Sequence, residues 1–402
     1  MKKKNSKIKQ PKSAKKYHGR KVKKAVKDAA DTGIGAAEQN QQGPVIAQEL
    51  LPPEPWSEAV DGGAVVQDVL SAVERHTVMS PAEQLAVALW VIYSYCYDLW
   101  HYSPFLGFQS PTMRCGKSTA LGVVGALASK ALSIAHVTAA ALFRLIDEYT
   151  PSLLIDELDR IIHHNKDLHS VLNTAHKRDS AFVPRVVRGE VVRFNVYGPK
   201  AMASIGKLPG TVQDRAIAIN LRRKRLDEHV ELLPSDPVAA YADLRRKIAR
   251  WVQDNRNAIA HQQPEIPAGL NDRAADNWRP LLAIARALSP YWYGVARRHA
   301  VEVSRAADIE SVDPAEQLLR DIKRVFDAAR NVKRLPVSRL HAALVKCESG
   351  IWADTRQPLS KARLARMLSP FSISSKVVRM GSQVQRVYEL GDFADAFSRY
   401  CA

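Results

Sequence analysis

The spacing of apolar and polar residues changes several times along the chain, and each change predicts a different element. Residues 63–76 and 80–100 carry apolar side chains at helical spacing, and the second stretch is apolar on most sides, as in a buried helix. Short apolar runs follow, with helical stretches such as 117–130 and 139–149 between them. The runs that we expect to be strands are 104–109, 132–137, 152–155, 200–205 and 216–221. Strands that alternate with helices predict an α/β protein with a parallel sheet.

The pattern changes again in the second half of the chain. Residues 182–188 and 190–196 alternate around Gly189, which predicts a β-hairpin whose exposed arginines either touch nucleic acid or guard a sheet edge. Residues 238–300 are helical and would form a lid. Helices are then expected at 314–329, 336–347 and 359–368, and strands at 376–380 and 384–388 around the turn Gly381-Ser382. Three helices followed by a hairpin are typical of a winged helix-turn-helix.

The turn after the first predicted strand carries a candidate nucleotide-binding motif. It reads TMRCGKST, which fits G-x-x-x-x-G-K-[ST] except that Pro111 replaces the first glycine. Backbone N–H groups of such a loop cradle phosphates, and a proline removes only the donor at the entrance. Lys117 would place a cation on the β- and γ-phosphates, and Ser118 would ligate Mg²⁺. The residues expected to touch the nucleotide are Thr112, Met113, Arg114, Cys115, Gly116, Lys117, Ser118 and Thr119.

A second half of the site is expected where the apolar strand 152–155 ends in Asp156 and Glu157. The carboxyl ends of strands are where open α/β sheets bind ligands. Asp156 would hold Mg²⁺, and Glu157 would be the base that orients and polarises an attacking water. The alternative is that the two acids only cap the next helix. The two motifs together, with one strand–helix unit between them, favour the nucleotide site.

Two later strands end or begin next to candidate polar groups. Ser204, or alternatively Lys207, follows the strand at 200–205 and would hold the attacking water or sense the γ-phosphate. Arg215 stands just before the last strand, where it would pair with Asp214 or project across a subunit boundary. The run Arg222-Arg-Lys-Arg225 then leaves the sheet as a basic exit.

Two further basic features concern the lid and the last helix of the C-terminal part. Arg273 would reach the phosphates from the lid, unless it pairs with Asp272 or Asp276. The helix at 359–368 presents a basic face opposite Leu364, and such a helix can enter a major groove. The alternative is a protein-binding winged helix. The candidate DNA-binding residues are Lys361, Arg363 and Arg366 on this helix and Arg379 and Arg386 on the wing.

The charge and the cysteine content restrict the possible binding partners and the cellular compartment. The formal net charge is +18, and residues 1–28 hold thirteen Lys or Arg against the single acid Asp28. This tail cannot bury an apolar face and either attracts nucleic acid or is only a solvated terminus. The longest apolar run, 85–97, is too short for a membrane span, which needs ~20 residues. Four widely spaced cysteines favour a reducing cytoplasm over a disulfide framework or a structural zinc site.

The order of these motifs resembles the AAA+ branch of P-loop ATPases. The stretches SPTMRCGKST, LLIDELD, IGKLPGTVQDRAIAINLRRK and LNDRAADNWRPLLAIA are similar to a family of domains of unknown function from phage, plasmid and genomic-island proteins, often beside primase or helicase modules. The resemblance covers roughly residues 60–400. It implies that Lys117, Ser118, Asp156 and Glu157 serve the nucleotide and that Arg215 is an arginine finger acting on a neighbour's γ-phosphate.

The sequence therefore predicts a P-loop NTPase fold, a three-layer parallel-sheet core with helical segments and a winged-helix-like end. The expected parts are a basic tail and linker (1–55), a helical segment (56–103), the ATPase core (104–235), a helical lid (236–308) and the winged-helix-like part (309–402). The expected function is ATP hydrolysis with Mg²⁺ by a homo-oligomer bound to DNA rather than RNA, as a helicase-like motor of a mobile element. The alternatives are an ATP-switched DNA-binding regulator with slow hydrolysis, or an ATPase that acts on protein partners.

Overall fold

The structure is a computed structural model that describes most of the chain. The described residues are 50–134, 139–162, 165–310, 314–329, 332–346, 352, 358–380 and 383–401. The predicted basic tail lies outside these ranges, as does the predicted turn Gly381-Ser382. All described residues belong to the unit Leu50–Ala402.

A five-stranded parallel sheet lies at the centre of residues 104–221, as the pattern of apolar runs predicts. Its strand order is β2-β3-β6-β1-β7, and every neighbouring pair is parallel. The strands are β1 (Phe105–Ser110), β2 (Ala131–Ile134), β3 (Ser152–Ile155), β6 (Lys200–Ile205) and β7 (Ala216–Asn220). Because all five run the same way, their carboxyl ends share one edge of the sheet and their amino ends share the other.

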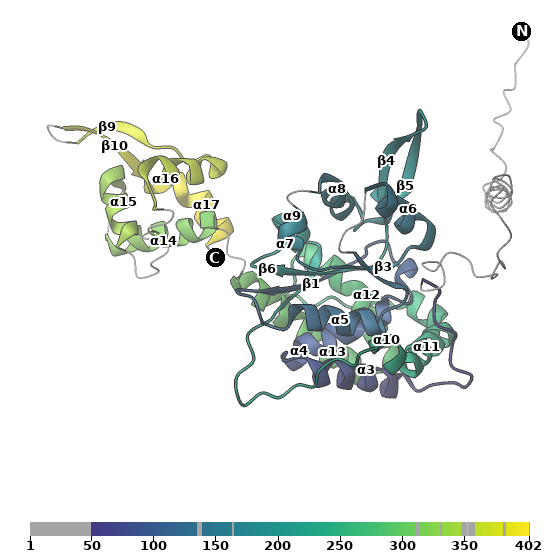
Figure 1. Ribbon diagram of the computed structural model, residues 1–402. Helices are drawn as coiled ribbons and strands as arrows, with labels where there is room; N and C mark the ends of the chain where they lie inside the picture. The colour runs from purple at the N-terminus through teal and green to yellow at the C-terminus, as the bar shows by residue number, and fades with distance from the viewer. Residues whose placement is uncertain are drawn as a thin grey trace, which may run out of the picture. The chain divides into compact units, whose positions relative to one another are not determined.

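Both faces of the sheet are buried, which explains why its strands read as apolar runs rather than as alternating ones. Leu106 and Phe108 of β1 point into one core, and Phe105 points into the other. Alternation along a strand places successive side chains on opposite faces. In Figure 1, the helices α3 (Gly62–His76), α4 (Pro81–Tyr93), α5 (Lys117–Leu127) and α10–α13 (between residues 237 and 310) lie on one side of the sheet, and the helices α6–α9 (between residues 139 and 213) lie on the other.

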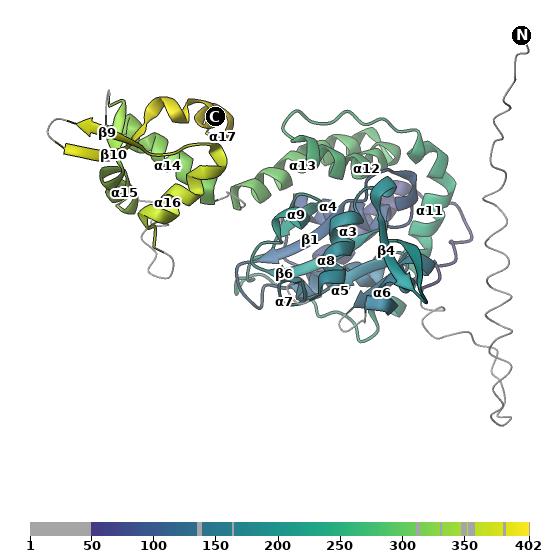
Figure 2. The same cartoon turned by 90° about the horizontal axis from the view of Figure 1, so that it is seen from above.

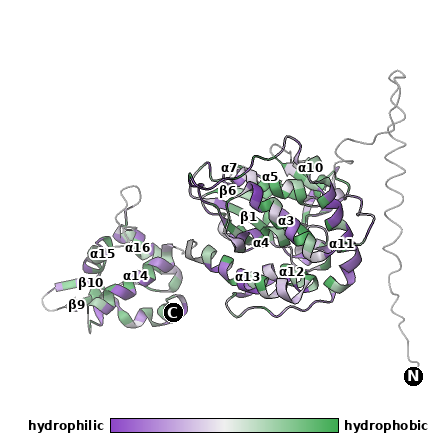
Figure 3. Cartoon of the chain, turned by 90° about the horizontal axis from the view of Figure 1, so that it is seen from below, coloured by the Kyte–Doolittle hydropathy of each residue, from purple (hydrophilic) through white to green (hydrophobic). Residues whose placement is uncertain are grey.

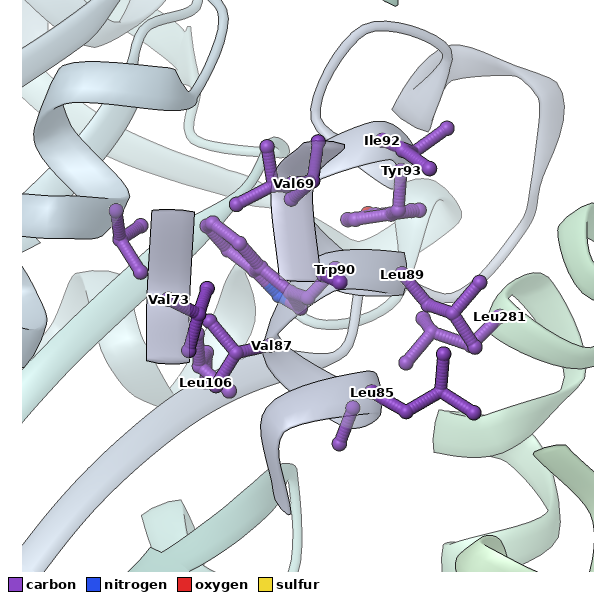
Figure 4. Packing of buried hydrophobic residues seen from close by; sticks show 14 of the residues in the cluster. Val69, Val73, Leu85, Val87, Leu89, Trp90, Ile92, Tyr93, Leu106 and Leu281 are labelled. Carbon is purple, nitrogen blue, oxygen red and sulfur yellow. The ribbon is translucent and has the colours of Figure 1, made fainter. Parts of the chain in front are cut away.

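The first core is built around α4 (Pro81–Tyr93), whose apolar residues surround the helix and are nearly all buried. Ser80 and Glu83 form a capping box at its start, and Glu83 also accepts a hydrogen bond from the Asn220 backbone at the end of β7. Figure 4 shows side chains of α3 (Gly62–His76), α4 and β1 gathered around Trp90. The regular helix ends earlier than predicted, and the chain continues with i→i−3 hydrogen bonds from Tyr95 to Ile92 and from Cys96 to Tyr93.

Three later helices, which the sequence predicts to form a lid, contribute side chains to this same core. They are α11 (Ala242–Ala260), α12 (Asp272–Leu288) and α13 (Pro290–Glu310), and the short α10 (Pro237–Ala240) precedes them. Their buried residues, among them Trp251 and Leu281, join one cluster with α3, α4, α5 (Lys117–Leu127) and the sheet. Figure 3 shows hydrophobic and hydrophilic residues along both α12 and α13, as expected of helices with one buried face.

The second face of the sheet carries smaller elements and a hairpin. The helices are α6 (Ala139–Tyr149), α7 (Leu158–Ile161), α8 (Lys166–Thr174) and α9 (Gly210–Gln213). The predicted hairpin is present as β4 (Phe182–Val187) and β5 (Glu190–Asn195), and it projects from this face in Figures 1 and 2. Two of its arginines are held locally, since Arg185 pairs with Asp167 and Arg193 lies over the Phe182 ring.

The C-terminal part has its own core. It contains α14 (Pro314–Ala328), β8 (Arg334–Pro336), α15 (Val337–Val345), α16 (Lys361–Leu368), β9 (Lys376–Met380), β10 (Gln383–Glu389) and α17 (Ala394–Tyr400). The three strands form an antiparallel sheet in the order β8-β10-β9. Asp321 is fully buried in this core and accepts a hydrogen bond of 2.8 Å from the Trp352 indole. The sequence predicts the helices α14, α15 and α16 and the β9–β10 pair, and it misses β8 and α17.

Candidate nucleotide site

The candidate site begins in the turn between β1 and α5, residues 111–116, which we name the glycine loop. Arg114 (φ 65°) and Gly116 (φ 82°) both adopt left-handed backbone conformations. Gly116 adopts this conformation without strain, and it is the residue from which α5 begins. The two left-handed residues turn the chain back on itself at the carboxyl end of β1.

The backbone donors of this turn are left without partners. Within the continuous described stretch 112–119, no backbone N–H group donates a hydrogen bond to another protein group. Some of these groups belong to the first turn of α5, where the helix dipole adds positive potential. A run of unsatisfied N–H groups at the start of a helix is a ready site for an anion.

The Lys117 side chain lies over the glycine loop. Its ammonium group donates to the Ser110 hydroxyl at 2.7 Å and to the Thr112 carbonyl at 3.3 Å. Among the described residues, no carboxylate lies within ion-pair distance of it. The positive charge is therefore held at the loop and remains available to an anion.

Cys115 is buried in the same loop. Burial raises the pKa of its thiol, but hydrogen bonds with Thr112 and Ser110 and the nearby charge of Lys117 outweigh that effect. The pKa consequently lies below its usual value. The hydrogen bonds of the loop are thus the main reason for the lowered pKa of this thiol, and the charge of Lys117 adds to their effect.

Asp156 and Glu157 follow β3 at the carboxyl edge of the sheet, as predicted. Asp156 is half-buried, and its carboxylate accepts a hydrogen bond of 2.8 Å from the Glu157 backbone. Glu157 is exposed, has a left-handed backbone (φ 50°) and forms a 3.0 Å ion pair with Arg160. A non-glycine residue in this conformation is strained, and such strain is concentrated at functional sites.

The sheet order brings the glycine loop and these acids to one edge. Only β6 separates β1 from β3, and neighbouring strands lie about 4.8 Å apart, so the two strand ends are roughly 10 Å apart across the sheet. Ser118 and Asp156 line the same groove, which has a volume of about 410 Å³. The structure therefore brings together the two motifs that the sequence predicts to form one site.

Ser204 and Lys207, at the end of β6, differ in how far their side chains are buried. Ser204 is fully buried, and its hydroxyl donates to the Ile205 carbonyl at 3.3 Å. Lys207 is exposed and comes directly after Gly206, whose N–H donates to the Ser110 carbonyl at 2.8 Å. Of the two predicted alternatives, Lys207 is thus the one whose side chain is accessible beside the glycine loop.

Arg215 lies at the opposite, amino edge of the sheet, where its carbonyl accepts from the Phe105 N–H at the start of β1. The six residues of β1 span roughly 20 Å at about 3.3 Å per residue, which separates Arg215 from its own glycine loop. Arg273, at the start of α12, is next to it rather than at the loop. Partial burial and then the charge of Arg273 lower the pKa of Arg215.

A buried polar network holds this amino edge together. His176 Nε2 lies 2.8 Å from Asn277 Oδ1, and Asn277 Nδ2 donates to the Asp214 carbonyl at 3.0 Å. Burial lowers the pKa of His176 to about 4, against the weaker effect of the Asn277 hydrogen bond. Lys200 is fully buried nearby at the start of β6 and donates to the Val196 and Gly198 carbonyls. These contacts fix α12 to the turn that carries Arg215.

One set of residues at the site is not identified from the sequence. Arg223 Nη2 donates to the Met113 carbonyl of the glycine loop at 3.4 Å. Arg222 and Lys224 line a groove together with Gly116 and Thr119. The sequence shows only a basic run after a strand, and no local signal indicates that it crosses the loop.

In the C-terminal part, the predicted basic residues lie mostly on the surface. Lys361 and Arg366 are exposed on α16, Arg363 is half-buried, and Leu364 and Leu368 on the opposite face are buried. Arg379 on β9 and Arg386 on β10 are exposed. The helix thus has the amphipathic division that the sequence predicts.

Among the described residues, no group of three or more His, Cys, Asp or Glu side chains is arranged to hold a metal ion. None of the helices in the described ranges is long and apolar enough to cross a membrane.

Comparison with known proteins gives one family match. A model of the family described as "Protein of unknown function (DUF3631)" matches residues 220–400, a little under half of the chain. The match agrees with the predicted resemblance to a family of domains of unknown function. It begins after the glycine loop and Asp156, so it covers neither motif.

A curated protein of Saccharopolyspora erythraea, described as an uncharacterized 28.9 kDa protein in the xis 5′ region, is 30% identical over 161 residues. The matched stretch is 39% of this chain and 59% of that protein, so it spans less than two thirds of the relative's length.

Two solved structures of the NrS-1 C-terminal region, both the A-form apo structure, resemble this chain weakly. They are 14% and 13% identical, with TM-scores of 0.43 and 0.41. Each alignment covers 85% of this chain, and 78% and 77% of the respective structures. We take no function from them.

Proposed function

We propose that the chain is a P-loop ATPase of the AAA+ type that binds ATP with Mg²⁺ at the carboxyl edge of its sheet and acts on DNA. The observation that supports this most directly is the row of unpartnered N–H groups at residues 112–119, beneath the ammonium group of Lys117. This arrangement suits a polyphosphate, and the missing glycine at Pro111 leaves these donors in place.

The donor set also fits a magnesium ion that is held partly by its substrate. Mg²⁺ is usually bound by one or two protein ligands together with waters and substrate phosphates. Ser118 and Asp156 share a groove and would be those ligands. When bound, the ion would neutralise charge on the phosphates, whereas Lys117 would orient the γ-phosphate.

Hydrolysis would need a base from the subunit itself and a positive charge from a neighbouring copy. Glu157, released from Arg160, would orient the attacking water and accept its proton, and Lys207 or Ser204 would help to hold that water. Arg215 faces away from its own loop, which suits an arginine finger that acts on the nucleotide of a neighbouring copy. Arg273 stands beside it and would contribute at the same boundary.

Nucleic-acid binding would reside in the C-terminal part. Three helices and a three-stranded antiparallel sheet are the parts of a winged helix, with α16 in the recognition position. The exposed charges of Lys361, Arg366, Arg379 and Arg386 suit contact with phosphates. The motifs resemble those of phage, plasmid and island proteins, and one relative is described by its position 5′ of xis. A role in replication or maintenance of mobile DNA follows from this combination.

A second function, an ATP-switched DNA-binding regulator with slow hydrolysis, is favoured by one contact. The ion pair with Arg160 engages the carboxylate of Glu157, the candidate base, within its own subunit. In that case ATP would control assembly, and the chain would not unwind DNA. Strand displacement on a forked duplex separates the two functions, because only a motor displaces the strand.

Measurement of ATP binding and hydrolysis tests the proposal. Wild type should bind and hydrolyse ATP, Lys117→Ala should lose binding, and Glu157→Gln should bind but fail to hydrolyse. Equal turnover by all three proteins would remove the catalytic assignment. Lys177→Ala, which removes an exposed lysine near the amino edge, is the matched control and should behave as wild type.

A further inference from the structure

The segment between β7 and α10 crosses the glycine loop, and we name its residues 222–230 the strap. Both ends of the strap are anchored. The Leu221 N–H donates to the Gln109 carbonyl at 2.8 Å, and the Glu231 N–H donates to the Arg75 carbonyl at 2.8 Å. Leu233 then packs so closely on α5 that a Cβ at Gly122 would lie 2.9 Å from its Cδ1 atom. The strap is therefore held over the start of α5, although it contains no helix or strand.

The first half of the strap puts its positive charges at the glycine loop. Arg223 donates to the Met113 carbonyl, and Arg222 and Lys224 line a groove of about 320 Å³. Gly116 and Thr119 line the same groove. The strap thus lies against the loop that carries the unpartnered N–H groups.

The acidic residues in the strap and next to it lie beside arginines. Asp227 and Glu228 both pair with Arg225, at 3.4 Å and 3.1 Å. Glu231 lies 4.0 Å from Arg75. Within the described residues, neither Arg223 nor Lys224 has a carboxylate within ion-pair distance. Cations gathered without counter-charges beside free N–H groups attract an anionic ligand.

The two grooves flank the first turn of α5 and differ in chemistry. Ser118 faces the groove that contains Asp156, whereas Thr119 faces the groove under the strap. Val78, Leu221 and Val230 give the second groove apolar walls. Apolar walls suit a nucleoside, and the cations at the loop suit the phosphate nearest to it. The volume lies at the small end of the usual range for ligand sites, roughly 300–1,000 Å³.

We infer that the strap binds the nucleoside end of the nucleotide, with Arg223 and Lys224 on the phosphate nearest the nucleoside. This inference rests on the proposed ATP binding and adds a second set of contacts to it. Because ATP and ADP share this end, the strap stabilises both to the same degree. Arg223 and Lys224 are therefore binding residues that do not sense the γ-phosphate.

Titration of fluorescent ATP and ADP analogues with Mg²⁺, at fixed ionic strength, tests the inference. Arg223→Ala should weaken both nucleotides by about 10-fold, the size expected for one hydrogen bond to a charged group. Lys224→Ala should act in the same direction, and Arg223→Lys should retain most of the affinity. Arg225→Ala is the matched control, since it removes the same charge from the strap but one that is neutralised locally. It should stay within about 2-fold of wild type, as expected for an exposed ion pair.

Each other outcome decides against the inference in a distinct way. If Arg223→Ala and Arg225→Ala behave alike while Lys117→Ala abolishes binding, the strap has no role and the proposed function stands. A loss for ATP without a loss for ADP would move Arg223 to the γ-phosphate and contradict the assignment. If wild type binds neither nucleotide, the proposed function fails and the inference fails with it.

Discussion

The two edges of the parallel sheet differ in whether their polar groups have partners within the chain. At the carboxyl edge the N–H groups of residues 112–119 have no partners, and Lys117 and Lys207 are not neutralised by acids within the described residues. At the amino edge His176, Asn277 and Lys200 are buried and hydrogen-bonded to one another or to backbone carbonyls. Polar groups without partners at one edge suit the proposed binding of a ligand, whereas the buried, hydrogen-bonded groups at the other edge support the fold.

Arg215 and Arg273 are the exception at the amino edge. Their charges are adjacent, and neither has a carboxylate within ion-pair distance in the described part of the chain. Like charges repel, and Arg215 is offset by the charge of Asp214 and by the Thr211 carbonyl, to which its guanidinium donates. Under the proposed trans role, the anion that these arginines meet would be the nucleotide of another copy, because the subunit's own glycine loop is roughly 20 Å away.

The largest expected effect comes from removing Arg215. Under the proposed trans role, Arg215→Ala should retain ATP binding and lose hydrolysis by roughly 10³-fold or more, the usual contribution of an arginine finger. Steady-state hydrolysis across a range of protein concentrations measures this. Arg279→Ala, which removes another exposed arginine of α12, is the control and should change little. Full hydrolysis by a dilute monomer of the wild type would end the trans role.

The next effect concerns the stability of the amino edge. The pKa of His176 is about 4 in the folded chain and 6.5 ordinarily, so the unfolded chain binds a proton more readily between these values. Stability from this group is therefore present above about pH 6.5 and is lost as the pH falls toward 4, by roughly 3 kcal/mol at most. Urea unfolding at a series of pH values measures the loss.

A variant sharpens the same measurement. His176→Gln cannot take up the proton, so its unfolding free energy should fall less than that of wild type between pH 6.5 and 4. The variant should be less stable than wild type at neutral pH, because its fit to Asn277 is changed. If the unfolding free energies of the two proteins fall in parallel with pH, protonation of His176 is not the cause of the pH dependence of stability.

A smaller effect is expected in the C-terminal part. Because the proposed nucleotide contacts lie at the edges of the parallel sheet and not in the C-terminal part, Lys361→Ala and Arg366→Ala should leave ATP binding unchanged. Each should reduce the salt dependence of DNA binding by about one unit of the log–log slope, as expected for a lost phosphate contact. Anisotropy titrations of labelled duplex at several salt concentrations measure it. Slopes equal to that of wild type would place DNA contact elsewhere.

The sheet and the site are predictable from the sequence to different degrees. The strands at 152–155 and 200–205 are found without error because fully buried parallel strands read as continuous apolar runs. Helix α4 is predicted too long, because periodicity does not reveal that the hydrogen bonds change to the i→i−3 pattern at Tyr95. The packing of the predicted lid helices on the first core is not predicted, because helical spacing says which face is buried and does not say against what.

The site shows the same division. The motif spacing and the predicted strand ends locate Lys117 and Asp156. The carboxyl ends of parallel strands share one edge of the sheet, so residues that follow two such strands are expected near each other. The position of Arg273 depends on how α12 packs, through Asn277, and this contact spans 63 residues of sequence. Arg223 reaches Met113 across 110 residues, so nothing local could indicate it. Residues placed by long-range packing are the ones that sequence reasoning misplaces or overlooks.

The central claim is that the glycine loop and the end of β3 act on one metal-bound triphosphate, and a double-mutant cycle tests it most directly. Mg²⁺-dependent ATP affinity would be measured by calorimetry for wild type, Ser118→Ala, Asp156→Asn and the double variant. If both residues hold the same ion, each single change should remove most of the Mg²⁺ dependence, and the double variant should be little weaker than either. Fully additive losses, or Mg²⁺ dependence that survives in Asp156→Asn, would contradict the claim.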